Sequence, residues 1–249
     1  MRQPYFELGP FTFYYYGLFI ALGLFFYYLY LKKNSSLSGI EYSLTQKAFF
    51  VSLVFALIGG RLYHVLSSLP YYLLHPFEIF YLWQGGLGIF GAILGGLLGI
   101  YVFSLMYEIK LIKILNLIAP PLLLAQAIGR VGNFFNHESF GPPTKLPWKV
   151  FIPAVNRPPK FVSFSYFHPT FLYESVLCLL AFGVYIFLKK KLKMNEFGFG
   201  YYLLSYGLIR FLTEFLRLDT WKIFDFKLGF LASLIMIGSG VFLLFRRVR

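Results

Sequence analysis

Long apolar runs separated by short charged segments recur along the whole 249-residue chain. A helix that crosses a bilayer needs about 20 mostly apolar residues, because it must span the hydrocarbon while satisfying its own backbone hydrogen bonds. The chain therefore predicts an all-α membrane protein, a bundle of about seven transmembrane helices. The predicted spans are 12–31, 47–67, 87–107, 111–129, 170–188, 198–217 and 228–245.

The composition supports this class of protein. Only 13% of the residues are charged and 58% are hydrophobic, whereas soluble domains are about one-quarter charged. We expect one integral membrane domain covering residues 1–249, with a proline-rich loop region at 130–169 that leaves the membrane. The first apolar run is not expected to be a cleaved signal peptide, because only Arg2 precedes it and its strong charges follow it.

The basic residues indicate how the chain is oriented. A net charge of +13 is also compatible with nucleic-acid binding, but the cations gather at the ends of apolar runs. Because short cytoplasmic loops are rich in Lys and Arg, we expect the N-terminus and the 130–169 region outside, the C-terminus in the cytoplasm, and no nucleic-acid partner. The clusters are Lys32–Lys33, Lys110 with Lys113, Lys189–Lys191 with Lys193, and Arg246, Arg247 and Arg249.

The residue inventory excludes several kinds of chemistry. The single cysteine, Cys178, rules out a disulfide framework and is expected to be a small buried hydrophobe. Asp219 and Asp225 lie close together in one loop, unlike the separated pair of an aspartyl protease. The histidines lack metal-ligand spacing, so neither a metal nor a cofactor is expected. They are His64, His75, His137 and His168.

Polar residues gather near the predicted outer ends of four spans. The densest group is GRVGNFFNHESFG at 129–141, which contains Arg130, Asn133, Asn136 and Glu138. A second group follows a helical spacing of four residues, so its members share one face of the span at 198–217. It consists of Tyr206, Arg210 and Glu214, with Arg217 three residues further on. The remaining polar residues are Arg61 in GGRLYH, and His168 and Glu174 in HPTFLYE.

Arg130 and Arg210 together predict an anion site. Guanidinium groups fit phosphate with paired hydrogen bonds, and the commonest phosphate at this depth of a bilayer belongs to a phospholipid head group. Two structural alternatives stay open, an ion-pair ladder on 198–217 and a polar plug at 129–141 that satisfies a broken helix end. Gly129 and Gly132 favour either a sharp turn or the close approach of a ligand.

A glycine-rich run, GGLGIFGAILGGLLG, occupies residues 85–99. Gly91, Gly95 and Gly99 recur every four residues, a pattern that lets two membrane helices approach closely. We expect helix packing here, with the close approach of a lipid as the alternative. In the next predicted span, Pro120 and Pro121 interrupt the apolar run, and we expect a kink that neighbouring groups satisfy.

The segment GRVGNFFNHESFG resembles the signature of the bacterial prolipoprotein diacylglyceryl transferases, a pattern close to G-R-x-G-N-F-x-N-x-E-x-x-G. Every fixed position of that pattern is present. The resemblance covers nearly the whole chain, because four further motifs occur in the family's order, beside a first-span motif in YYYGLFIALG. The four are GGRLYH, WQGGLGIFGA, HPTFLYE and YGLIRFLTEFLR.

This resemblance implies a multi-pass enzyme of the bacterial cytoplasmic (inner) membrane. Its substrates would be phosphatidylglycerol and the lipobox cysteine of a preprolipoprotein, and it would release glycerol phosphate from a thioether-forming transfer. Catalytic roles are implied for Arg130, Arg210, Tyr206 and Glu138. Binding of phosphatidylglycerol is implied for Arg130, Asn133, Arg210, Tyr16, Arg61 and Gly141, with support from Asn136, Glu214, Arg217, His168 and Glu174.

One position departs from the family pattern. The family often carries a histidine, proposed as a general base, where this chain has Phe90. Another group must then serve, and the candidates are Glu138, Tyr206, His64, His168 or the substrate phosphate itself. An arginine-rich site also stabilises a thiolate without any base. A membrane transporter and a non-catalytic phospholipid-binding homologue are the rival functions.

Overall fold

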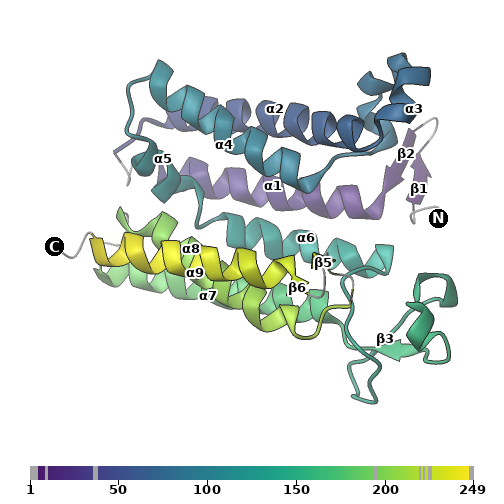
Figure 1. The fold of residues 1–249 in the computed structure, drawn as a ribbon. Coiled ribbons are helices and arrows are strands. Elements are labelled where there is room, and N and C mark those ends of the chain that lie inside the picture. Colours follow the sequence, from purple (N-terminus) through teal and green to yellow (C-terminus); the bar gives the residue numbers. More distant parts are fainter. Residues whose placement is uncertain are drawn as a thin grey trace. The chain divides into compact units, whose positions relative to one another are not determined.

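The computed structural model describes residues 5–8, 11–35, 39–192, 196–218, 220, 222–223 and 226–246 (Figure 1). Arg2, Lys193, Asp219, Asp225, Arg247 and Arg249, named above, lie outside the described residues. Within the described part the chain is mostly helical, as the apolar runs predict. The longer helices are α1 (Tyr15–Asn34), α2 (Tyr42–Ser67), α4 (Ile89–Met106), α5 (Leu111–Ile118), α6 (Leu122–Asn136), α7 (Thr170–Leu192), α8 (Gly198–Glu214) and α9 (Leu228–Arg246).

Short elements connect these helices. In the described part of the chain, three antiparallel strand pairs, β1 with β2, β3 with β4 and β5 with β6, are additions that the sequence analysis does not predict. The strands are β1 (Tyr5–Leu8), β2 (Phe11–Tyr14), β3 (Val150–Phe151), β4 (Tyr166–Phe167), β5 (Lys222–Ile223) and β6 (Phe226–Lys227). The short helical turns are α3 (Leu69–Leu74), η2 (Pro76–Phe80), η3 (Leu82–Gln84), η4 (Ala154–Asn156) and η5 (Pro159–Phe161).

Five of the described helices are long and apolar enough to cross a membrane: α1, α2, α4, α7 and α9. A sixth span exists if α5 and α6 are counted as one, because together they meet the same criterion but are bent by 47° at a break between them. The break falls at Pro120–Pro121, so the predicted kink is confirmed. Helix α8, with 17 residues, is shorter than these five, and its place as a seventh span stays a prediction.

The contacts within the chain divide it into two units, residues 31–115 and residues 1–30 with 116–249. In the unit of residues 31–115, glycines bring α2 and α4 together. A Cβ atom on Gly91 would overlap the Gly59 carbonyl, and one on Gly95 would overlap the Phe55 carbonyl. A Cβ on Gly99 would lie 2.8 Å from the Phe55 side chain. The packing interpretation of the glycine run is therefore confirmed.

The second unit, residues 1–30 with 116–249, is built around α6, α7 and α8. Leu123, Ala127, Cys178 and Ile209 from these three helices form a buried cluster. Cys178 is 0% exposed, which confirms its expected role as a small buried hydrophobe. The first turn of α8 is held by Asn116, whose side-chain oxygen accepts a hydrogen bond from the Phe199 backbone N–H at 3.0 Å.

The predicted start of the loop region at residue 130 is wrong. Helix α6 continues to Asn136, and it ends where His137 adopts a left-handed backbone conformation with φ 52° and ψ 44°. Gly129 and Gly132 are helical, so neither makes the sharp turn that the sequence suggested. Gly132 instead makes room for α1, because a Cβ there would lie 2.9 Å from the Tyr16 ring. The loop region therefore runs from 137 to 169.

Adjacent glycines on α4 allow a matched test of the α2–α4 packing. Gly95→Ala places a methyl group against the Phe55 carbonyl, whereas Gly96→Ala places one 3.4 Å from the Ser52 hydroxyl, an ordinary contact. We expect Gly95→Ala to destabilise the protein by about 1–3 kcal/mol, as overpacking does, and Gly96→Ala to change stability little. Thermal unfolding of the purified protein in detergent measures both. Equal melting temperatures for the two variants would contradict the packing.

Candidate functional site

A buried carboxylate, that of Glu174, lies at the centre of the polar residues. Glu174 stands one turn into α7 and its side chain is 1% exposed. Its Oε1 accepts from Arg130 Nη2 at 2.7 Å and from the Tyr206 hydroxyl at 3.1 Å, while its Oε2 accepts from Arg210 Nη1 at 3.3 Å. Residues of α6, α7 and α8 thus meet at one side chain, and Glu174 joins Arg130 to Arg210; the anion site expected at these two arginines stays a prediction.

A second carboxylate, that of Glu214, completes the ion network on α8. Arg210 Nη2 lies 2.8 Å from Glu214 Oε2, one helical turn away, so the predicted polar face of this helix is confirmed. Glu214 is also 1% exposed. It fits only because Gly229 of α9 has no side chain, since a Cβ there would overlap the carboxylate. Lys227 donates to the Glu214 and Arg217 carbonyls at 2.7 and 2.9 Å.

The guanidinium groups of Arg130 and Arg210 are partly exposed to solvent, although the carboxylates that they contact are buried. The side chains of Arg130 and Arg210 are 20% and 18% exposed. Each guanidinium has five N–H donors. The carboxylates of Glu174 and Glu214 accept hydrogen bonds from only some of these donors. The site therefore holds two pre-oriented cations with donors left for an anion. Arg217 lies just past the end of α8, where its charge also acts on Glu174.

Glu138 is held at the end of α6 by two asparagines. Asn133 Nδ2 donates to Glu138 Oε2 at 3.5 Å and Asn136 Nδ2 donates to Oε1 at 3.4 Å, while the Glu138 backbone N–H donates to the Asn133 carbonyl at 3.1 Å. Three polar residues of the signature segment are therefore joined by hydrogen bonds. Tyr16, on the first turn of α1, is subject to the charges of both Glu138 and Arg130.

Gly141 and His168 close the loop region where it leaves and rejoins the helices. The Gly141 N–H donates to the His168 carbonyl at 2.8 Å, and a Cβ on Gly141 would crowd Leu216, Thr170 and His168. The His168 imidazole lies 3.0 Å from the Tyr173 hydroxyl. These contacts give Gly141 and His168 structural roles, and a direct role toward a ligand stays a prediction for both.

His137, one of the four histidines of the chain, and Arg61, a predicted ligand-binding residue, lie apart from the Glu174 network in their contacts. Partial burial lowers the pKa of His137 below its usual range. Arg61 belongs to the unit of residues 31–115 and is 7% exposed. Its guanidinium donates to the carbonyls of Ile79 at 2.8 Å and Gly85 at 2.7 Å, and also to those of Gly86 and Glu78. A role for Arg61 in binding phosphatidylglycerol stays a prediction.

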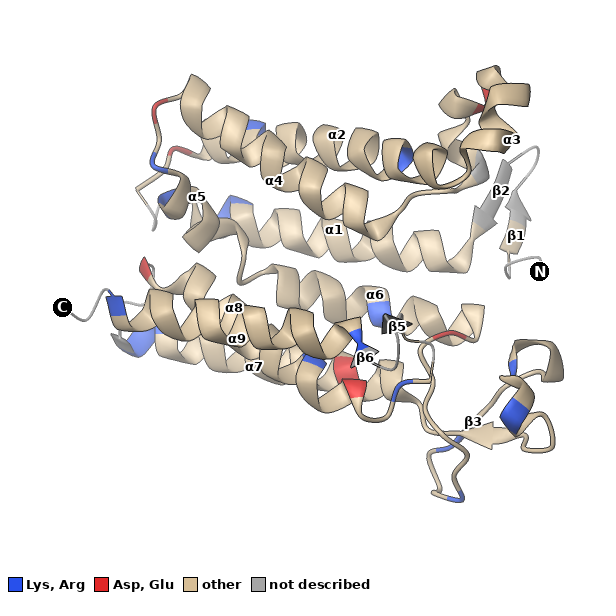
Figure 2. Cartoon of the chain, in the orientation of Figure 1, with Lys and Arg blue, Asp and Glu red and all other residues tan. Residues whose placement is uncertain are grey.

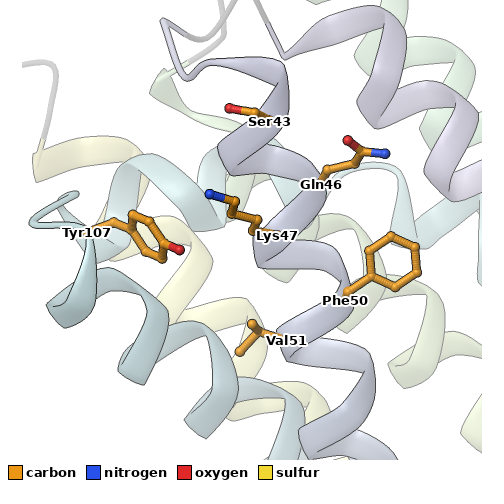
Figure 3. Close-up of a pocket in the computed structure, with 6 residues that line it drawn as sticks. All are labelled: Ser43, Gln46, Lys47, Phe50, Val51 and Tyr107. Carbon is orange, nitrogen blue, oxygen red and sulfur yellow. The ribbon is translucent and has the colours of Figure 1, made fainter.

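The same unit contains Phe90 and a surface hollow. Phe90 is 47% exposed and its ring lies 6.0 Å from that of Tyr63. The hollow lies where α2 begins and α4 ends, at the other end of this helix pair from Phe90 (Figure 3). None of the predicted site residues lines it. It is lined by Ser43, Gln46, Lys47, Phe50, Val51 and Tyr107.

Sequence reasoning missed two features of the site. It gave Glu174 only a supporting role, although this residue joins both arginines. It also missed Tyr202, whose ring stacks on Tyr206 with centroids 5.8 Å apart and whose hydroxyl accepts from Gln126 at 3.0 Å. The helical spacing gave a signal for Tyr202, because it precedes Tyr206 by four residues. No such signal marked Glu174, because its partners lie on other helices.

Comparison with known proteins gives a consistent match. The family model described as prolipoprotein diacylglyceryl transferase matches residues 3–246. A protein of Nostoc sp. named phosphatidylglycerol–prolipoprotein diacylglyceryl transferase is 39% identical over 242 residues, covering 94% of this chain and 85% of the relative. Proteins of the same name from Fervidobacterium nodosum and Thermotoga maritima are each 37% identical, covering 96% and 97% of this chain and 83% and 84% of the relatives.

The central position of Glu174 generates a stability prediction. Glu174→Gln keeps the shape of the side chain but leaves two mostly buried guanidinium groups without their shared counter-charge. Removing one partner of a buried ion pair costs about 3–5 kcal/mol, so we expect a clear drop in thermal stability. Glu78→Gln, at a side chain that is 31% exposed, is the control and should change stability by no more than about 0.5 kcal/mol. Unchanged melting of Glu174→Gln would contradict the network.

Proposed function

This chain belongs to the prolipoprotein diacylglyceryl transferase family, and we propose that it transfers the sn-1,2-diacylglyceryl group of phosphatidylglycerol to the lipobox cysteine thiol of preprolipoproteins, with release of glycerol phosphate. One observation carries the assignment of the site. Arg130 and Arg210 are oriented by Glu174, a carboxylate that is 1% exposed, while their own guanidinium groups remain partly open. Two fixed guanidinium forks are suited to a phosphodiester and to the phosphate monoester that leaves.

The charge balance of the site favours an anionic ligand. Four cations gather around it, Arg130, Arg210, Arg217 and Lys227, against the carboxylates of Glu174, Glu214 and Glu138. The carboxylates of Glu174 and Glu214 are engaged with guanidinium groups and sealed from solvent. The exposed edges of the arginines are therefore the positive groups that a lipid phosphate meets first.

In the proposed reaction, a sulfur–carbon bond forms and a carbon–oxygen bond breaks. The cysteine thiolate attacks the sn-3 carbon of the glyceryl group, and the phosphate oxygen departs with the bonding electrons as glycerol phosphate. Arg130 and Arg210 stabilise the charge that develops on that phosphate. Tyr206, which donates to Glu174 at 3.1 Å, fixes the carboxylate and through it the two guanidinium groups.

The thiol proton needs an acceptor, and Phe90 has no proton-accepting group, so the proton passes to the phosphate, which gains a negative charge as the carbon–oxygen bond breaks. The positive field of the arginines stabilises the thiolate form of a nearby thiol, and we propose that this field is the main source of activation. Glu138 is held by Asn133 and Asn136 and orients the head group. Asn133, Asn136 and Tyr16 support the same end of the site, and Gly141 and His168 fix the loop region beside it.

The membrane arrangement belongs to the same proposal. Helix α8 is the seventh span, the N-terminus lies outside the cell, the C-terminus lies in the cytoplasm, and the site faces the outer leaflet of the bacterial cytoplasmic membrane. The basic ends of α1 and α7, at Lys32–Lys33 and Lys189–Lys191, support this orientation through the positive-inside bias. The rival idea of a transporter loses its basis, because residues 3–246 match a transferase family.

Arg130→Lys tests the phosphate clamp. The variant keeps the positive charge but loses the planar fork that binds phosphate with two hydrogen bonds. We expect at least about a 100-fold loss of transfer, as for removal of one transition-state donor, measured with labelled phosphatidylglycerol and a lipobox peptide in vitro. Arg246→Lys, at the far end of α9, is the matched control. Full activity of Arg130→Lys would rule out the clamp, and an inactive wild type would favour the non-catalytic homologue.

Phe90→His tests whether the family's histidine is needed in this chain. If the field of the arginines activates the thiol, adding an imidazole at this position should change the transfer rate only modestly. The same lipid-transfer assay measures it, with Ile89→His as a control for the polarity change. A gain of several orders of magnitude would contradict activation by the arginines alone and would identify this chain as a degenerate enzyme.

A further inference from the structure

The loop region contains a small folded piece, residues 142–167, which we call the hairpin segment. Its strands β3 and β4 pair antiparallel, with Val150 opposite Phe167 and Phe151 opposite Tyr166. The two ends of the segment are held together, because Gly141 donates to the His168 carbonyl and His168 donates to the Pro142 carbonyl. The segment is therefore a defined structure and has two distinct sides.

One side of the hairpin segment is buried. Ile152 and Phe167 are 2% and 0% exposed and pack with Phe140, which is 5% exposed. Arg157 braces the turn beside them by donating to the Ile152 and Val162 carbonyls at 2.8 Å each. Because side chains alternate along a strand, burying Phe167 directs its neighbour Tyr166 to the opposite side.

The other side combines exposed aromatic rings with cations. Phe151 and Tyr166 are 54% and 45% exposed, and their ring centroids lie 6.1 Å apart. The Lys149 ammonium lies 4.5 Å above the Tyr166 ring, and the Arg157 guanidinium lies 5.7 Å from the Phe151 ring. Further apolar side chains about half exposed or more in the same segment are Trp148, Val155, Val162 and Phe164.

The hairpin segment has cations but no carboxylates. Its charged residues are Lys145, Lys149, Arg157 and Lys160, and it contains neither Asp nor Glu. In Figure 2 the ribbon around β3 carries blue and no red. Exposed aromatic rings with lysines and arginines whose stems lie along them are typical of surfaces that rest at a membrane interface, with the rings at head-group level and the charges toward lipid phosphates.

We propose that the hairpin segment lies on the membrane surface and binds the phosphate head groups of anionic phospholipids. The uniform positive charge favours binding to an anionic surface. The half-exposed rings favour a surface with an apolar layer beneath its charged groups. A membrane has such a layer, whereas a free phosphate or an acidic soluble protein does not. The segment lies close to the site along the chain, since Glu138 precedes it and Glu174 follows it within a few residues. The inference rests on the proposed outward orientation and does not depend on catalysis.

Fluorescence quenching of Trp148 tests the proposal. The chain has three tryptophans, so replacing Trp83 and Trp221 by Phe leaves Trp148 as the only reporter. The full-length protein is placed in nanodiscs of phosphatidylcholine with or without phosphatidylglycerol, and the lipids are brominated near the head-group end of the acyl chains. We expect strong quenching by the lipid and protection from aqueous iodide in discs that contain phosphatidylglycerol, and about half that quenching or less in pure phosphatidylcholine.

Charge variants supply the matched control. Each basic residue near an anionic surface strengthens the attraction about five-fold, so Lys149→Gln with Lys160→Gln should abolish most of the quenching that depends on phosphatidylglycerol. Lys32→Gln with Lys33→Gln, in α1 at the opposite end of the predicted span, should leave it unchanged. Inorganic phosphate should not protect Trp148 from iodide.

Three outcomes would overturn the proposal. If iodide quenches Trp148 and the brominated lipid does not in discs that contain phosphatidylglycerol, the segment does not contact the membrane. Equal quenching in both lipids shows apolar contact without recognition of anionic head groups. Shielding that requires an added lipobox peptide shows that the surface binds peptide instead. A transfer assay on the Lys149→Gln/Lys160→Gln variant separates this proposal from the catalytic one, because chemistry at Arg130 and Arg210 is retained when the surface contact fails.

Discussion

The ion network centred on Glu174 is the interaction on which the rest of this structure depends. A charge in the interior of a membrane protein is stable only when a partner neutralises it. Here one sealed carboxylate joins Arg130 of α6 to Arg210 of α8, and Glu214 engages Arg210 from the other side. Helices α6, α7 and α8 must therefore assemble in a single register, because any slip would strand a buried charge.

Small residues allow this assembly and hold its surroundings in place. Gly229 leaves space for the Glu214 carboxylate, and Gly132 leaves space for Tyr16 beside the signature segment. Lys227 donates to the carbonyl of Glu214, the last residue of α8, and to that of Arg217 just beyond it, which ties the end of the helix to β6. In the proposed reaction the arginines are therefore oriented before the ligand binds, and little reorganisation is needed when phosphate charge develops.

The site and the hairpin segment make different use of the same residue types. At the site, guanidinium groups are paired with carboxylates and retain only an edge for a ligand. On the hairpin segment, cations lie over exposed rings and no carboxylate shares the segment. The first arrangement suits one phosphate held in a fixed geometry, and the second suits many head groups held loosely. Both follow from where the chain places its few carboxylates.

The sequence by itself determined the membrane class, the break at Pro120–Pro121, the use of the glycine run of α4 for helix packing and the shared face of Tyr206, Arg210 and Glu214. Each of these depends on local spacing or composition, which a single segment contains. Only the tertiary structure decided that Glu174 joins the arginines, that α6 runs on to Asn136, and that Gly132 accommodates Tyr16 instead of forming a turn. The physical reason is that contacts between helices distant in sequence are set by packing and charge pairing, and no local pattern specifies them.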